Sequence, residues 1–380
     1  MLVVKNKIVF MRWRRNMWVK IISRLLNESS GLALFKINLP CPKREFILKI
    51  AKVFIGSNNA HFKYKIMIIK AQLFLFFSFT ATLSAQQDFK PYDQTVVGTP
   101  ISIKMVPILA GSFLMGSSDK EKGHEADESP MKKVQIDSFW MAAYEMSFDI
   151  YSYFTDEEKD PAPKPDAISR PSPPYIDLTQ GMGKYGGYPA NSMSQYNALM
   201  FCKWLYLKTG VFFRLPTEAE WEYACRAGSI TIYPQGKDAK QLKEYAWYDK
   251  NSEDKYHKIG ALKPNAWGLY DMLGNVAEWT LDEYQADYFK TISETNPSVP
   301  SSSRNGKPRS VRGGSYQDKE TDLRSANRSK SDPIWNRRDP QIPKSKWWNA
   351  DAPFVGFRII KPFKQPTKEE IEAFFKLYLE

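Results

Sequence analysis

The feature that most constrains the fold of this 380-residue chain is a set of four motifs in a fixed order. They are RLPTEAEWEYACRAG at 214–228, GLYDMLGNVAEW at 268–279, VRGGSY at 311–316 and VGFRII at 355–360. One short motif alone is a weak signal, because such patterns also occur by chance. Four of them in order are highly specific, and they determine far more about the fold of this chain than about its activity.

Through these motifs the chain resembles the formylglycine-generating, or sulfatase-modifying factor, family from about Met105 to Ile360. The domain of that family is an irregular α+β fold of the C-type-lectin-like kind with little regular secondary structure. The resemblance implies the same fold here. We therefore expect residues 105–361 to form this domain, residues 86–104 to lead into it, and residues 362–380 to form a helical tail.

The net charge of +12 belongs to the start of the chain. Residues 1–66 carry 14 Lys and Arg against 2 Asp and Glu, and residues 67–85 add only Lys70. Residues 86–380 therefore carry a net charge of −1. A protein that binds phosphate backbones needs a surplus of basic residues. We expect no nucleic-acid partner.

Residues 67–85 have the pattern of a secretory signal peptide. Lys70 lies near the start, an apolar run is centred on residues 73–79, and small residues at 83–85 resemble a cleavage site. The run is shorter than the roughly 20 residues that span a bilayer. No Cys follows it that could carry a lipid. The alternative is a membrane anchor extended by residues 66–69, but we favour export to the periplasm or cell surface, with no stable membrane span.

The basic residues 1–66 precede this signal, although a signal normally begins a protein. One interpretation is that translation starts at Met67 and that these residues are upstream sequence read in frame. The other is a basic cytoplasmic extension of a membrane-anchored protein. We favour the first, and both interpretations leave residues 1–66 outside the folded domain.

The strand signals are short. Residues 105–116 predict a strand, a Gly turn and a second strand. The alternation of Val134 and Ile136 predicts another strand, which leads into a buried segment. Residues 160–188, rich in Pro, Gly and Tyr, predict a long loop, and loops of this length tend to be functional.

The helix signals are clearer. Ser147 is a candidate cap for a short helix, and residues 192–208 predict an amphipathic helix that Thr209-Gly210 ends. Thr217 and Glu220 form the pattern of a capping box. We interpret the motif's glutamates at 218, 220 and 222 as helix start and surface charge rather than as metal ligands.

Cys202 and Cys225 lie in predicted helices and are the two cysteines beyond the predicted signal. In an exported chain they can form one disulfide. The alternative is a pair of buried free thiols. Relatives bond cysteines at these positions to partners near the C-terminus, and no Cys follows residue 225 here, so we favour the thiols.

The GLYDMLGNVAEW motif is the strongest candidate site. Gly274 permits a turn that a side chain would obstruct, and Asp271 and Glu278 lie on either side of it. Carboxylates together with main-chain carbonyls can supply the oxygen ligands of calcium. The resemblance implies a structural calcium held by Asp271, Gly274, Val276 and Glu278, the middle two through backbone oxygens. The alternative is a metal-free loop whose carboxylates cap its neighbours.

The residues for the family's oxidase chemistry are missing. The resemblance implies a copper-binding cysteine two residues after GGSY and another five residues later, and thiolates suit Cu(I). Those positions hold Asp318 and Leu323. We therefore expect no copper and no formylglycine formation. Iron held by histidines, a second route in the superfamily, is not expected from only His61, His124 and His257.

Residues 317–353 combine basic side chains with Trp335, Trp347 and Trp348. Arg and Trp dominate binding hot spots, so Arg324 and Trp347 are candidate cleft residues together with Asp318 and Ser315, which lines the cleft in relatives. The cleft would take an envelope protein, a peptide or a glycan. The alternative is an insertion that packs its tryptophans on the core and pairs its charges on the surface.

Two hypotheses follow for function. The first is a non-catalytic binding or scaffold protein of a bacterial envelope, similar to exported family members associated with gliding and secretion machinery. The second is an oxidoreductase of the same family with a changed active site, acting on a peptide or a siderophore-type substrate. No Ser/His/Asp arrangement can be recognised from spacing, so nothing favours hydrolysis.

Overall fold

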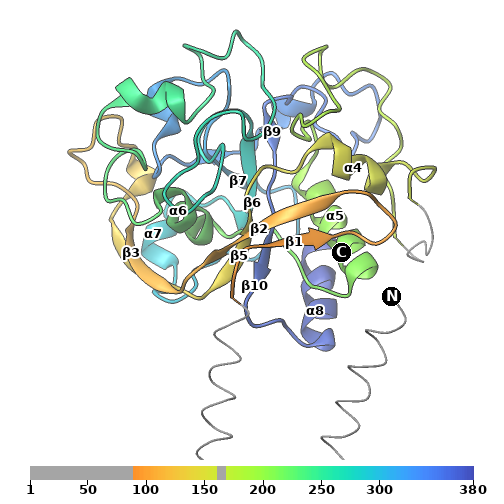
Figure 1. The fold of residues 1–380 in the computed structure, drawn as a ribbon, viewed down its shortest axis with the longest axis horizontal. Coiled ribbons are helices and arrows are strands. Elements are labelled where there is room, and N and C mark those ends of the chain that lie inside the picture. Colours follow the sequence, from red (N-terminus) through yellow and green to blue (C-terminus); the bar gives the residue numbers. More distant parts are fainter. Residues whose placement is uncertain (1–88, 161–167) are drawn as a thin grey trace, which may run out of the picture. The chain divides into compact units, whose positions relative to one another are not determined.

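The computed structural model describes residues 89–160 and 168–380, and residues 89–380 form one compact unit (Figure 1). The predicted signal and residues 1–66 lie outside the described residues. Within the described ranges, no helix is both long and apolar enough to cross a membrane.

The largest antiparallel sheet joins the two ends of the domain. Its strands, in spatial order, are β1 (Tyr92–Thr95), β2 (Ser102–Ile108), β5 (Phe139–Ala142) and β10 (Ile360–Pro362). Ile360, the last residue of the fourth motif, lies opposite Met141 of β5. The segment 86–104 was predicted only to lead into the domain, but β1 and the start of β2 lie in it and belong to this sheet.

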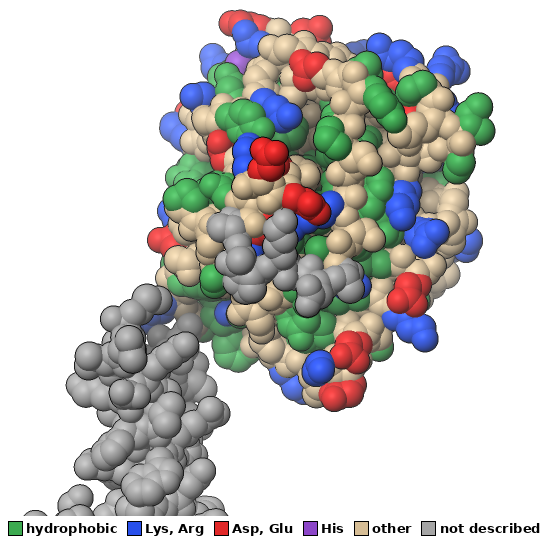
Figure 2. Space-filling model, turned by 90° about the vertical axis from the view of Figure 1, so that its right-hand side faces the viewer, with side chains coloured by type: hydrophobic (Ala, Val, Ile, Leu, Met, Phe, Trp, Pro, Cys, Tyr) green, Lys and Arg blue, Asp and Glu red, His purple; other side chains and the backbone are tan. Residues whose placement is uncertain are grey.

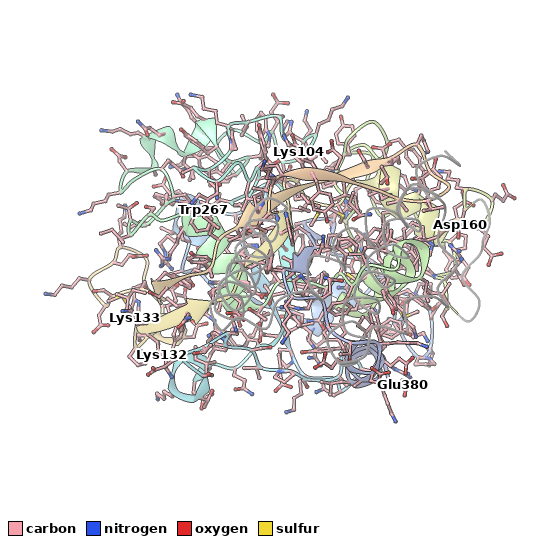
Figure 3. The ribbon with its side chains drawn as sticks, turned by 60° about the horizontal axis from the view of Figure 1, so that its bottom comes forward. Lys104, Lys132, Lys133, Asp160, Trp267 and Glu380 are labelled. Carbon is pink, nitrogen blue, oxygen red and sulfur yellow. The ribbon has the colours of Figure 1, made fainter. Side chains whose placement is uncertain are left out.

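The predicted strands around the Gly turn are β2 and β3 (Gly111–Met115), which belong to different sheets. β3 pairs instead with β4 (Lys132–Ile136), the strand predicted from Val134 and Ile136. This hairpin lies on the opposite side of the molecule from Asp160, as the labelled Lys132 and Lys133 show (Figure 3).

A second four-stranded sheet forms the centre of the domain. Its order is β8 (Ser329–Lys330), β7 (Arg309–Arg312), β6 (Ala277–Glu283) and β9 (Val355–Gly356), with β6 and β9 parallel. Every residue of β6 is buried. The second, third and fourth motifs therefore meet in this sheet.

The helices in the described part of the chain are α4 (Phe148–Thr155), α5 (Gln195–Thr209), α6 (Glu218–Arg226), α7 (Tyr288–Thr291) and α8 (Lys368–Leu379). Short 3-10 turns cover 126–128, 239–244, 320–323 and 333–336. Ser147 occupies the cap position of α4, but its side chain makes no capping hydrogen bond. The predicted C-terminal helix is α8.

Helix α5 begins and ends as predicted within a few residues, with Ser194 as N-cap and Gly210 in the left-handed region. The prediction that it is amphipathic is wrong. Its residues are buried on most sides, because α4, β6 and α8 all contact it (Figure 1). A helix surrounded by neighbours needs no polar face.

Helix α6 confirms the capping box: the Thr217 hydroxyl accepts from the Glu220 amide, and the Glu220 carboxylate accepts from the Thr217 amide. The expectation of surface charge is wrong for Glu218 and Glu222, which are fully buried. Glu222 pairs with Arg226 one turn further along α6. Both glutamates also pair with arginines about a hundred residues further on, Arg312 and Arg328, which local spacing cannot show.

Cys202 and Cys225 are free and buried, so the predicted alternative of two thiols is confirmed and the disulfide is wrong. Cys202 belongs to the apolar cluster around α5, whereas Cys225 belongs to the cluster around α6. Burial raises the pKa of both thiols, to about 12 for Cys225. Both are therefore protonated core residues.

Candidate functional site

The four motifs converge around Trp221 and Glu278. The Glu278 carboxylate accepts from Trp221 Nε1 at 2.8 Å and from Arg358 Nε at 2.8 Å. The guanidinium of Arg312 lies 5.3 Å from the Trp221 ring centroid and donates to Glu222 at 2.5 Å. Each motif therefore contributes a charged or aromatic side chain to one buried network, and this explains why the four occur together.

The predicted calcium loop has the backbone that its sequence suggests. Asp271 and Gly274 both have positive φ, at 52° and 75°. A Cβ on Gly274 would lie 2.1 Å from the carbonyl oxygen of Trp247, so only glycine fits. Val276 and Glu278 follow directly, at the start of β6.

This loop is short of positive charge. Glu145, Asp271 and Glu278 are all buried beside one guanidinium, that of Arg358. Burial, with repulsion from the other two carboxylates, raises the pKa of Glu145 well above its ordinary value. Burial likewise raises the pKa of Asp271 to about 6. Uncompensated buried carboxylates are costly, and a cation would relieve them.

Asp271 and Glu278, the two carboxylates predicted to bind calcium, differ in how well they could do so. Asp271 Oδ2 accepts from the Gly260 amide at 2.6 Å, while its buried Oδ1 has no hydrogen-bond partner among the described residues. Both oxygens of Glu278 accept from Arg358. Within residues 89–160 and 168–380, no three His, Cys, Asp or Glu side chains are grouped to hold a metal. Asp271 therefore fits a calcium ligand better than Glu278 does.

The two positions that carry cysteines in family oxidases lie in different surroundings. Asp318 Oδ2 accepts from the Ser315 amide at 2.8 Å and from the Ser315 hydroxyl at 2.7 Å. Burial raises the pKa of Asp318. Leu323 is fully buried in the apolar cluster around α6. The structure thus brings Ser315 and Asp318 together, and it places a leucine in the core where the second thiolate would lie.

Arg324, a predicted cleft residue, forms a buried ion pair. It is 1% exposed and donates to both carboxylate oxygens of Glu128, at 2.7 and 2.5 Å, and to Glu121 at 3.1 Å. Its neighbour Arg328 pairs in the same way with Glu218. These two arginines of the 317–353 segment therefore hold the fold together.

Trp347 lies elsewhere, in an open groove of about 970 Å³ whose lining includes neither Ser315, Asp318 nor Arg324. We call it the tryptophan groove. Its walls come from the start of α5 (194–196), from Trp279 and from the segments 172–178, 303–309 and 331–350. On the side of the molecule that carries α4 and α5, hydrophobic, basic and acidic side chains are interspersed over the surface (Figure 2).

The tryptophans of the 317–353 segment have the packing that the second interpretation predicts, and the binding interpretation stays a prediction. Trp335, Trp347 and Trp348 pack against the core cluster around α5, as an insertion would, and they also line the tryptophan groove. Sequence reasoning missed the opposite wall, at 172–178 and 303–309. The predicted long loop 160–188 was the available signal for the first of these.

A Ser/His pair that spacing did not reveal lies beside Arg324. The Ser117 hydroxyl is 2.7 Å from His124 Nδ1 and also donates to Glu128. Ser117 is 1% exposed, so no substrate carbonyl can reach it. The pair is part of the ion-pair network and not a nucleophilic centre.

Comparison with known proteins agrees with this geometry. Residues 96–341 match the family described as the sulfatase-modifying factor enzyme 1-like domain. The formylglycine-generating enzyme of Mus musculus is 32% identical over 257 residues, which cover 56% of this chain and 66% of that protein. A protein named inactive C-alpha-formylglycine-generating enzyme 2, from Bos taurus, is 38% identical over 109 residues, or 26% of this chain and 34% of that one. The chain thus spans less than two thirds of either relative.

The fold also matches a solved structure. PvdO from Pseudomonas aeruginosa superposes with a TM-score of 0.55 at 25% identity, covering 71% of this chain and 99% of that chain. This confirms the predicted fold class.

Proposed function

This chain belongs to the sulfatase-modifying factor enzyme 1-like family, and we propose that it is an exported binding or scaffold protein of a bacterial envelope without copper-dependent oxidase activity. One observation carries the proposal. The positions of the two copper-binding cysteines hold Asp318, whose carboxylate is engaged by Ser315, and the fully buried Leu323. Cu(I) prefers soft thiolates, and neither side chain supplies one.

Two further points support a binding role. Over 109 residues the chain is similar to a protein named inactive, which supports a role without oxidase activity. The tryptophan groove offers an open surface for a ligand, such as an envelope protein, a peptide or a glycan. Export rests on the signal-like residues 67–85.

We also propose a structural calcium at Asp271, Gly274, Val276 and Glu278. It is supported by the surplus of buried carboxylates and by Asp271 Oδ1, which has no hydrogen-bond partner among the residues that the structure describes. When bound, the ion would neutralise buried negative charge and stabilise the loop before β6. Glu278 could join it only by giving up part of its pairing with Arg358.

The test of the main proposal compares this chain with the mouse formylglycine-generating enzyme as positive control. Each is incubated with Cu(I), oxygen, a thiol reductant and a cysteine-containing peptide, and the peptide mass is followed. We expect no conversion by the full-length chain and no copper retained against a competing chelator. Conversion that Asp318→Ala abolishes, in a variant with an unchanged circular dichroism spectrum, would overturn the proposal.

The binding role is tested by native mass spectrometry of the chain isolated from its own cell envelope. A stoichiometric protein, peptide or glycan partner supports it. A retained redox metal without a partner favours an oxidoreductase instead.

A further inference from the structure

The tryptophan groove has an aromatic floor that is already fixed in position. The Trp347 ring centroid lies 5.1 Å from that of Tyr196, edge to face, and Trp335 lies 5.7 Å from Trp279 in the same manner. Trp335 and Trp347 are half-buried, and both Tyr196 and Trp279 belong to the core. Rings held in this way lose little conformational entropy on binding, which favours them as anchors for a ligand.

Buried polar atoms without partners line the same groove. Gln195 is 2% exposed; its Nε2 donates to the Thr280 carbonyl at 2.6 Å, and its Oε1 has no partner among the described residues. Arg309 is 4% exposed, and its Nε is also without a partner in the described part of the chain. Unsatisfied buried groups are uncommon and costly. Both atoms lie beneath the surface of the groove, where they leave one acceptor and one cationic donor unsatisfied in its wall.

The charge at the groove is basic. Arg304, Lys344 and Lys346 line it, and none forms an ion pair with a carboxylate of the described residues. Lys346 Nζ lies 5.1 Å from the Trp347 centroid. The lining also contains the acidic residues Asp332 and Asp339, but its basic residues outnumber them. The unmatched positive charge therefore favours an anionic ligand.

The rim distinguishes between anionic ligands. Tyr175, Ile176 and Ile342 line the groove while 78%, 49% and 98% exposed. A glycan can stack the C–H face of a sugar ring on Tyr175, but its hydroxyl groups offer little apolar surface to Ile176 and Ile342. A peptide can cover them with apolar side chains of its own.

From these contacts we propose that the tryptophan groove binds an extended acidic segment of a partner protein, in which carboxylates alternate with aromatic, aliphatic or proline residues. The inference rests on the proposed binding function and specifies the chemistry of its ligand. Carboxylates of the segment would face Arg304 and Lys346, and its apolar side chains would lie between Ile342 and the floor at Trp347.

The test selects binders from a library of random short peptides displayed on phage, with the immobilised full-length chain as target. Enriched peptides are synthesised with a fluorophore, and their dissociation constants are measured by anisotropy. We expect Asp or Glu interspersed with apolar residues, and weaker binding at high salt. Ile342→Ser should weaken binding about fivefold and Trp347→Ala about tenfold or more.

Ile230→Ser is the matched control, because Ile230 is 94% exposed and does not line the groove. It should leave the dissociation constant unchanged. Arg304→Glu tests the charge without disturbing the core, and it should weaken acidic peptides only.

Several results would overturn the inference. They are no enrichment above background, enrichment of basic or neutral peptides, and equal affinities for Ile342→Ser and Ile230→Ser. Groove-dependent binding of heparin oligosaccharides without any selected peptide would replace the peptide by an anionic glycan, while leaving the binding function standing. Copper-dependent turnover, by contrast, would refute the proposed function but would leave the inference that the tryptophan groove binds an acidic segment untouched.

Discussion

Replacement of Asp271 by Asn tests whether the buried carboxylate in the GLYDMLGNVAEW loop carries an uncompensated charge and binds a cation. Asn tolerates the positive φ of this position, and its Oδ1 can still accept from the Gly260 amide. The pKa of Asp271 is raised by burial from 3.8 to about 6. Its folded pKa therefore exceeds its unfolded pKa, so the group's contribution to stability is full below the unfolded value and is lost as pH rises through 6.

The magnitude follows from the shift. Without calcium, the raised pKa of Asp271 lowers the free energy of unfolding by roughly 3 kcal/mol at pH 8 and by about 1 kcal/mol near pH 4.5, relative to a pH below both pKa values. As the pH rises from 4.5 to 8, the free energy of unfolding of Asp271→Asn should therefore increase by about 2 kcal/mol relative to that of the wild type.

Urea unfolding in the presence of EGTA measures this difference, with the exposed Asp93→Asn as control. Added calcium should stabilise the wild type at pH 8 and not Asp271→Asn, because a bound ligand shifts the unfolding equilibrium. A difference between variant and wild type that is the same at both pH values, with and without calcium, would refute both the buried charge and the ion.

Two further predictions concern groups that are fully buried. Arg324→Gln should lower the free energy of unfolding by about 3–5 kcal/mol, because it leaves Glu128 as an unpaired buried charge; the double variant with Glu128→Gln should recover part of that loss, and an additive result in urea unfolding would contradict the pairing. Cys202 and Cys225 should not react with Ellman's reagent in the native protein and should react fully in guanidinium, because burial raises their thiol pKa; rapid reaction of the native protein would show that the helices open.

The sequence predicted those parts of the fold whose causes are local. Thr217 and Glu220 bond to each other within one helical turn, so their spacing alone identified the start of α6. Gly274 was identifiable because a turn that excludes a side chain has to be glycine. The motif order then identified the family, since each motif supplies part of one network.

The rest depended on contacts between distant segments. Nothing near Glu218 and Glu222 indicates that Arg328 and Arg312 will neutralise them, so both looked like surface charge. Arg324 looked like a cleft residue for the same reason. Only part of the tryptophan groove could be predicted from the sequence. Trp347 was a candidate, but the walls at 172–178 and 303–309 come close to it only through the tertiary fold.

The convergence of the four motifs also constrains the order in which the chain can fold. Arg358 donates to Glu278, 80 residues earlier, and to the carbonyl of Ala142, 216 residues earlier. The closing strand β10 comes later still. Contacts of such long range make folding slow, because the chain loses the entropy of closing large loops before the stabilising contacts form. A nascent chain that stops before VGFRII therefore lacks the guanidinium of Arg358 that pairs with Glu278, and its central sheet lacks β9 as an edge. The protein can therefore reach its native state only after the last motif has been synthesised.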